Sequence, residues 1–401
     1  MKRVFVLALS LILISPHAAA APKAVPVGLG SIYSAPVGSE SVVQSGRNLI
    51  YIANTSSSSS DISLTAFDLS GAQTWQRTID SGADEVFTAS TIDFQGNIWL
   101  TGSAALLNPT ETPTRTAGID NPDNVVSETS TALRQDMSYL ALWKISPTGE
   151  LVATYLAPRN ENGLSEIPMA SSISATNSGI SIVGSLTTRP FFISASTVGI
   201  FSKMVFIGTS KSEFNSVVRH SDGSSTIYGS SAEALAGKKA AGLRDGVLIR
   251  ISKTGAITKL VRSSAPKASR SWISGDSSFL ASGPVITGKV TETAITKFTS
   301  VFAPTWTLRI PSVGPSRTLS ANGNSYLALS SKSAITGISK WKPSAPALLV
   351  ITFDNKGVIT AATALPGLVT PISLQYSKER GVTGLASASD GTVSIFTLVS
   401  R

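Results

Sequence analysis

The chain has 401 residues, of which 42% are hydrophobic and only 14% are charged, and its formal net charge is +9. This is enough apolar material for a large core, so the composition excludes a disordered chain. The chain has no cysteine and two histidines. It therefore cannot form disulfides, cysteine-ligated zinc sites or iron–sulfur clusters, and it offers no thiol nucleophile.

The N-terminus has the three parts of a secretory signal peptide. Lys2 and Arg3 form a basic start, residues 4–14 are apolar, and small residues follow at 18–20. The apolar run is shorter than the roughly 20 residues that span a bilayer. We expect residues 1–20 to be removed, leaving one soluble domain over residues 21–401 with no transmembrane segment. The predicted location is the periplasm, the cell envelope or the outside of the cell.

Two strand signatures alternate along the rest of the chain. The first is a glycine, a short apolar alternation and a small residue, clearest at 96–103 and repeated at 179–185, 223–230 and 283–288. The second is a hairpin with a polar, glycine-containing turn. It occurs at 142–151, 248–257 and 350–359, and residues 297–306 form a copy that lacks the glycine. Both signatures predict strands, and neither shows a helical period.

The hairpin glycines give the repeat length. Gly149 and Gly255 lie 106 residues apart, and Gly255 and Gly357 lie 102 apart, which is twice a unit of about 52. A period near 50 with four strands per unit is typical of a β-propeller. We expect an all-β, seven-bladed β-propeller with four-stranded blades, although the weak third and fifth units leave six or eight blades open. We expect the strand at 24–33 to complete the last blade, because closure removes open sheet edges.

One segment interrupts the repeats. Residues 106–135 form a polar insertion in the second blade, rich in Thr, Pro and Asn. It is too long for an ordinary hairpin loop, so it is either functional or disordered. Asp120 and Asp123 are its candidate metal ligands, because oxygen ligands at this spacing suit calcium. The alternative is an ordinary polar turn.

The second unit resembles the bacterial seven-bladed propeller repeat called SBBP. The similarity lies in residues 92–103 and 139–154, and residues 245–255 repeat the hairpin. Residues 66–75 resemble the repeat of PQQ-like propellers. Both resemblances imply a fold rather than an activity. A quinoprotein would also need calcium ligands and a stacking tryptophan, whereas Trp75, Trp99 and Trp143 lie on repeat strands where core packing explains them.

The sequence offers few catalytic candidates. After signal removal the only histidine is His220, in a turn. A hydrolase would pair it with a serine and a carboxylate, and the alternative is an ordinary turn histidine. The strongest asymmetry is a basic segment, in which a single acid, Asp245, lies among nine cations: Lys238, Lys239, Arg244, Arg250, Lys253, Lys259, Arg262, Lys267 and Arg270. Such a segment either binds an anionic polymer or is a solvated blade face.

We expect a monomeric, non-enzymatic binding or scaffold module that contacts a protein or an anionic envelope polymer through the basic segment or the insertion. Sequence-specific nucleic acid is not an expected partner. No cofactor is expected, and calcium is the one candidate. The alternative is a polysaccharide hydrolase or lyase, or a degenerate quinoprotein, with its site in the central channel. Acids converging with Tyr or Arg at one channel mouth would favour the enzyme, and a channel lined by Ser and Thr would favour the scaffold.

Overall fold

The computed structural model describes residues 24–56, 60–105, 137–158 and 166–398. The predicted signal peptide at 1–20, the insertion at 106–135 and its Asp120 and Asp123 lie outside the described residues. The described chain is all β, and within it no helix has the length and apolar character needed to cross a membrane.

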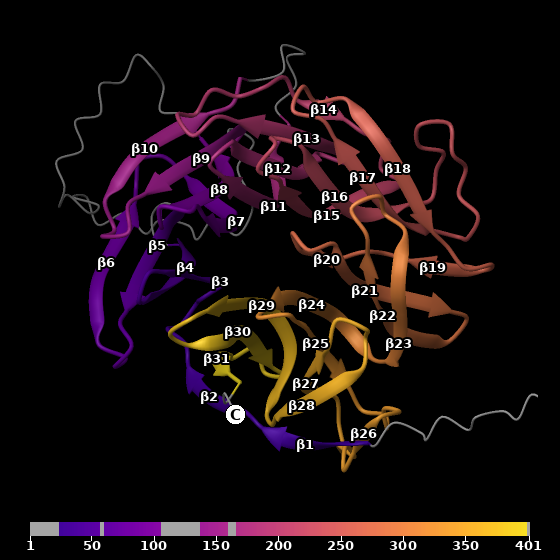
Figure 1. The fold of residues 1–401 in the computed structure, drawn as a ribbon. Helices are drawn as coiled ribbons and strands as arrows, with labels where there is room; N and C mark the ends of the chain where they lie inside the picture. Colours follow the sequence, from indigo (N-terminus) through magenta and orange to yellow (C-terminus); the bar gives the residue numbers. More distant parts are fainter. Residues whose placement is uncertain (1–23, 57–59, 106–136, 159–165, 399–401) are drawn as a thin grey trace, which may run out of the picture.

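The strands form sheets arranged around one axis, as a propeller (Figure 1). One strand of each sheet lies nearest to this axis. These inner strands are β3 (Ser41–Ser45), β7 (Glu85–Ile92), β11 (Pro168–Thr176), β15 (Ser212–Arg219), β20 (Ser274–Gly275), β24 (Val313–Ala321) and β29 (Leu368–Ser377).

The first four blades are each four consecutive antiparallel strands. The first blade continues from β3 through β4 (Asn48–Ser56), β5 (Ser60–Phe67) and β6 (Gln73–Ile79). The second continues from β7 through β8 (Ile98–Ala104), β9 (Tyr139–Ile145) and β10 (Leu151–Leu156). The third adds β12 (Gly179–Leu186), β13 (Arg189–Ala195) and β14 (Val205–Phe206) to β11. The fourth adds β16 (Ser225–Ser231), β17 (Asp245–Ile251) and β18 (Ile257–Ser263) to β15.

The later sheets depart from this pattern. In the fifth blade β19 (Ala268–Arg270) and β20 both pair with β21 (Leu280–Thr287), followed by β22 (Val290–Phe298) and β23 (Pro304–Pro311). The sixth has β24, β25 (Asn324–Ser331), β27 (Ala347–Phe353) and β28 (Ile359–Leu365), and it gains β26 (Ile338–Ser339) and β1 (Val25–Leu29). The remaining sheet, called the composite sheet below, joins β29, β30 (Gly381–Ala388) and β31 (Val393–Thr397) to β2 (Ser31–Ser34).

The prediction of seven equivalent four-stranded blades is therefore wrong. Five of the six blades are built on consecutive strands, the sixth takes in β1 from the N-terminus, and the composite sheet combines β2 with strands from the C-terminal end of the described chain. The single strand expected at 24–33 is also two strands: β2 pairs antiparallel with β31, whereas β1 pairs parallel with β28 and β26. β2 joins the last sheet as expected, whereas the turn signatures, which mark only hairpins, did not predict that β1 would join β28 and β26.

The small residues of the first signature lie opposite bulges in the inner strands. A Cβ on Gly102 would overlap the Val86 carbonyl oxygen, and Gly184 and Gly229 meet inner-strand carbonyls in the same way. Each glycine faces the position where β7, β11 or β15 shifts register, between residues 87 and 89, 170 and 172, or 214 and 216. A bulge adds one residue and re-aims its side chain, so these glycines allow the inner strands to turn extra residues toward the axis.

The predicted hairpins are confirmed at the outer strands. Gly149, Gly255 and Gly357 adopt φ of 89°, 86° and 82° in the turns before β10, β18 and β28. The glycine-lacking copy is also a hairpin, between β22 and β23, where Phe302 takes the glycine position with φ of 60°. This conformation costs a non-glycine residue about 1–2 kcal/mol. The Phe302 ring is only 2% exposed, and its burial offsets that cost.

The hydrophobic core lies between neighbouring sheets, as expected for the repeat tryptophans. Trp143 packs in the cluster between the first and second blades, with Trp75 against it, and Trp99 packs between the second and third. Trp99 and Trp143 are fully buried. These rings are structural members of the repeat.

Candidate functional site

A central cavity of about 550 Å³ lies among the inner strands. Serine and threonine hydroxyls supply most of its polar lining, and Glu40, Asp276 and Arg317 are the charged residues among its described lining. The bulge residues Thr88 and Ser171 belong to this lining, together with Asn215 of the fourth blade. The register shifts therefore place polar side chains around the axis.

Most of these hydroxyls bind the neighbouring blade. Ser41 Oγ and Ser90 Oγ are 2.8 Å apart across the first and second blades. Ser172 Oγ accepts from the Val217 amide at 3.1 Å across the third and fourth. Ser274 Oγ lies 3.0 Å from Thr318 Oγ1 across the fifth and sixth. A polar channel wall of this kind holds the ring together.

Arg317 is different, because its charge has no described partner. Its Nε donates to the Ile372 carbonyl at 2.6 Å, and its Nη1 donates to the Ser316 carbonyl at 3.0 Å. Nη2 makes no hydrogen bond to the described residues, and none of their carboxylates forms an ion pair with this guanidinium. Burial lowers the pKa of Arg317. A desolvated cation without an anion is costly, so the position favours an anionic ligand.

The two channel acids each have one oxygen engaged elsewhere, whereas Asp276 Oδ2 is buried and has no described hydrogen-bond partner. Glu40 accepts from Asn54 Nδ2 at 2.8 Å, while burial raises its pKa. Asp276 Oδ1 caps its own turn, accepting from Ser278 Oγ at 2.6 Å and from the Leu280 amide at 3.2 Å. Glycoside chemistry needs two carboxyl groups facing one substrate bond. These two acids hold a side chain and a turn instead.

His220 does not meet a serine nucleophile. Its Nε2 lies 2.8 Å from Thr226 Oγ1, and its ring stacks on Phe279 at 5.4 Å between centroids. Burial lowers the pKa of His220, and the nearby Arg250 lowers it further. The ring therefore packs as a neutral turn residue.

The basic segment divides into half-buried arginines that contact their own chain and exposed lysines, of which Lys238 donates to the Leu260 carbonyl at 2.7 Å. Arg262 forms an ion pair with the buried Asp245 at 3.4 Å, and Arg244 Nη1 donates to Ser230 Oγ at 2.9 Å. Arg250 lies over Phe279 and Phe302, 5.4 and 5.2 Å from their ring centroids.

Arg270 completes the set of inward arginines. It lies 4.2 Å from the centroid of the Trp272 ring. Burial lowers its pKa to about 10, and the neighbouring Arg309 acts in the same direction. The four arginines are thus half-buried parts of the fourth and fifth blades.

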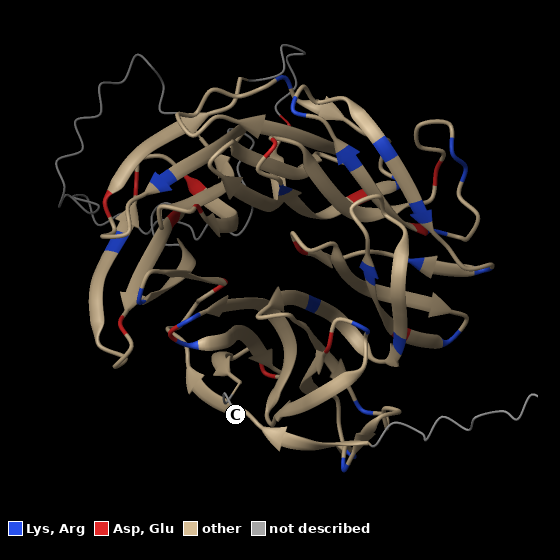
Figure 2. Ribbon diagram, in the orientation of Figure 1, with Lys and Arg blue, Asp and Glu red and all other residues tan. Residues whose placement is uncertain are grey.

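The five lysines are exposed but do not converge. Lys253 lies in the turn between β17 and β18, and Lys259 lies along β18. Lys238, Lys239 and Lys267 lie in loops at the opposite end of the same strands. Figure 2 shows the cations of this part of the chain spread along β17, β18 and the adjoining loop.

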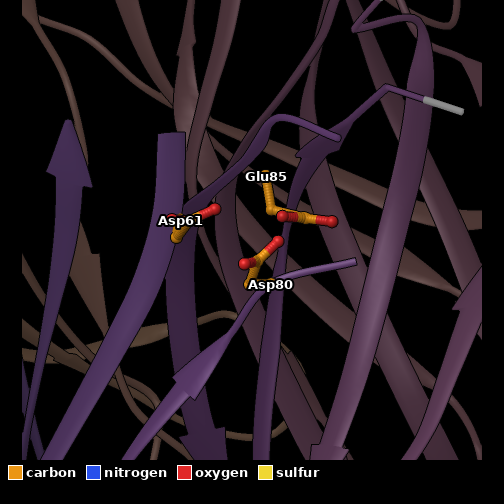
Figure 3. Close-up of side chains that lie close together, drawn as sticks. All are labelled: Asp61, Asp80 and Glu85. Carbon is orange, nitrogen blue, oxygen red and sulfur yellow. The ribbon is translucent and has the colours of Figure 1, made fainter. Parts of the chain in front are cut away.

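Three carboxylates meet at the junction of the first two blades, called the acidic junction below. Asp61 lies on β5, Asp80 directly follows β6, and Glu85 begins β7. One oxygen from each lies within 4.8 Å of the others, and the side chains face one another in Figure 3. Asp80 is exposed, whereas Glu85 is only 2% exposed.

The buried carboxyl group of Glu85 has a raised pKa. Its Oε1 accepts from the Ser81 amide at 3.2 Å and from the Ser81 hydroxyl. Burial, with smaller contributions from the charges of Asp61 and Asp80, raises the pKa of Glu85 to about 7, although the hydrogen bonds from Ser81 oppose the shift. Sequence reasoning missed this cluster because its members come from three elements. The only local signal was the acid-rich link at 80–85 between two repeats.

A second cavity, of about 720 Å³, lies between the composite sheet and the first blade. Its lining includes Tyr33, Tyr51, Phe67 and Arg380. Arg380 Nη2 donates to the Asp68 carbonyl at 2.6 Å, so this cation ties the two sheets together.

Comparisons with known proteins do not identify a family for this chain. No family model matches the chain, and no curated protein matches its sequence. The chain is similar to a structure of BBS1N in complex with ARL6DN, with a TM-score of 0.48 and 10% identity over 93% of this chain and 97% of that one. It is also similar to a putative 6-phosphogluconolactonase from Bacteroides fragilis, with a TM-score of 0.47 and 12% identity over 83% and 85% of the two chains.

Prolyl oligopeptidase B from Galerina marginata also resembles it, with a TM-score of 0.47 and 10% identity over 89% of this chain and 46% of that one. Likeness at this level does not bear on function. The propeller assignment rests on the sheets themselves. The SBBP-like and PQQ-like repeat types stay predictions.

Proposed function

We propose that the protein is an exported, non-enzymatic binding propeller that holds a small oxyanion, a carboxylate or a phosphate, in its central channel at Arg317. The observation that carries this proposal is the guanidinium without a described anion in a cavity lined by hydroxyls. Arginine presents donors in a planar fork that suits both oxyanions.

The cavity has further support for such a ligand. Its volume of about 550 Å³ lies within the usual range for small-molecule sites. Ser373, which lines it beside Ile372, has a hydroxyl with no described hydrogen-bond partner. Arg317, whose Nε donates to the Ile372 carbonyl, and Ser373, the residue after Ile372, therefore each have one polar group without a described partner.

Binding rather than catalysis agrees with the rest of the lining. The described lining includes no histidine, tyrosine or lysine that could transfer a proton. Its two acids already hold Asn54 and a turn. The lysines of the basic segment lie at both ends of the fourth blade, so they are weaker candidates for one continuous polymer surface.

The test is a calorimetric titration of the mature protein with phosphate, sulfate and citrate, at low and high sodium chloride. We expect one anion per chain, bound more weakly at high salt because the contact is ionic. Tighter binding of phosphate would indicate a phosphate ligand, and tighter binding of citrate would indicate a carboxylate ligand. Export itself predicts a secreted product that begins at Ala21, which N-terminal sequencing would read.

Arg317→Gln is the test variant, and Arg77→Gln is its control. Arg77 also donates to a backbone carbonyl, that of Gly149 at 2.9 Å, but it lies on the outer strand β6. We expect Arg317→Gln to lose the anion, Arg317→Lys to keep weakened binding and Arg77→Gln to bind like the wild type. Equal binding by a folded Arg317→Gln variant, or no binding by the wild type, would refute the proposal.

A further inference from the structure

We propose that the acidic junction is a divalent-cation site, of the calcium class, that joins the first two blades through Asp61, Asp80 and Glu85. The site is separate from the channel and does not depend on the oxyanion ligand.

The geometry fits one ion. Calcium binds oxygen ligands at about 2.3–2.6 Å, so two ligands on opposite sides of the ion are about 5 Å apart. The three carboxylate oxygens lie within 4.8 Å of one another. This spacing is compatible with a single ion that contacts all three.

The buried glutamate supplies an independent observation. Ser81 satisfies Glu85 Oε1, but Oε2 is buried and has no hydrogen-bond partner among the described residues. Figure 3 shows this carboxyl group facing those of Asp61 and Asp80. A buried acceptor without a donor is costly. Since the groups it faces are carboxylates, which donate nothing when ionised, a cation satisfies this oxygen.

The chemistry of the ligands selects the metal class. All three are carboxylates, and hard oxygen ligands suit calcium, magnesium and manganese rather than zinc or copper. Neither Asp80 nor Glu85 forms an ion pair with a described lysine or arginine. Ligands from two blades favour calcium, because calcium tolerates irregular geometry whereas magnesium demands a near-ideal octahedron.

A bound ion would add a contact between the first two blades, which the chain already joins through the link between β6 and β7. Asp61 belongs to the first blade and Glu85 starts the inner strand of the second, with Asp80 on the link between them. The ion would therefore fix the angle at which the second blade leaves the first. Its role is structural.

The experiment titrates calcium chloride into chelator-treated mature protein by calorimetry, and follows thermal unfolding with calcium and with chelator. We expect one calcium per chain and a higher unfolding temperature with calcium. Glu85→Gln should weaken binding at least about tenfold and abolish the shift, because affinity follows the number of charged ligands. Magnesium chloride should produce a smaller shift.

Two controls keep the result specific. Glu292→Gln removes an acid that is paired with Arg309 at 2.7 Å on the fifth blade, and it should bind calcium like the wild type. Asp120→Asn with Asp123→Asn removes the candidate ligands of the insertion, and it should also leave the binding unchanged. Absence of calcium binding by the folded wild type, or equal affinity in folded Glu85→Gln, would overturn the proposal.

Discussion

The paired hydroxyls of the channel wall and the carboxylates of the acidic junction are both polar, but they differ in whether they satisfy one another. In the channel the hydroxyls of adjacent blades bind one another, as Ser41 does with Ser90. At the acidic junction three groups of the same charge meet, and one oxygen of Glu85 has no described donor. Polar groups that satisfy each other stabilise a fold. Polar groups that cannot do so indicate what the fold binds.

The largest expected effect comes from a substitution that disrupts a bulged inner strand of the channel wall. Gly184→Ala places a methyl group against the Met169 carbonyl oxygen of the bulged inner strand. Backbone cannot move aside cheaply, so we expect a loss of about 3 kcal/mol in the free energy of unfolding, measured with urea. Gly391→Ala is the control, because its φ is 86° but nothing lies within 4 Å. Its cost should be only about 1 kcal/mol.

The next largest effect is the pH dependence of folding stability that Glu85 of the acidic junction causes when a chelator keeps calcium away. The pKa of Glu85 rises from 4.5 to about 7 in the folded protein. Between these values the folded state holds a proton that the unfolded state has lost, so stability falls as pH rises through this window. We expect a loss of about 2 kcal/mol, allowing for solvent screening. In Glu85→Gln this part of the slope should disappear, and an unchanged slope would refute the assignment.

A smaller effect tests whether paired hydroxyls of the channel wall satisfy each other's hydrogen bonds. Ser282 Oγ and Ser316 Oγ are buried and lie 2.8 Å apart between the fifth and sixth blades. Ser282→Ala leaves Ser316 without its partner, at a cost of about 1–2 kcal/mol. We expect the double alanine variant to cost less than the two single variants together. A double-mutant cycle measures this coupling, and strict additivity would contradict it.

The smallest expected effect concerns the charges of the acidic junction. Asp80 is exposed and its charge raises the pKa of the neighbouring Glu85. In chelator we expect Asp80→Asn to stabilise the protein by about 0.5 kcal/mol or less, because it removes a like charge. In calcium the same variant should be less stable than the wild type. The change of sign between the two melting experiments is the diagnostic result.

Hairpins and repeat length could be predicted from sequence because each depends on local residues. The turn glycines fix positive φ, and even Phe302 left a recognisable hairpin. The composition of the sheets was harder to predict, since β1 and β2 pair with strands more than 300 residues away. The need to close the last sheet predicted the pairing of β2, but no local pattern encodes the separate pairing of β1 with β26 and β28.

The sites were less predictable than the fold. Charge density along the chain pointed to the basic segment, but four of its cations turned out to be arginines bound within the blades. The acidic junction escaped notice because Asp61 and Glu85 are 24 residues apart and meet only when two blades pack. Arg317 belongs to no sequence motif. It is a candidate because its guanidinium has no described anion, and its neighbours along the chain do not reveal this.

The pairing of β1 and β2 also determines the order of assembly. Strands at 25–34 leave the ribosome first among the described strands, yet they need β26, β28 and β31 as partners. They therefore dock last, after a costly long-range closure that slows folding. Until then β28 and β31 expose open edges to which the same strands of a second molecule fit equally well. Concentrated refolding should consequently produce dimers that exchange their N-terminal strands.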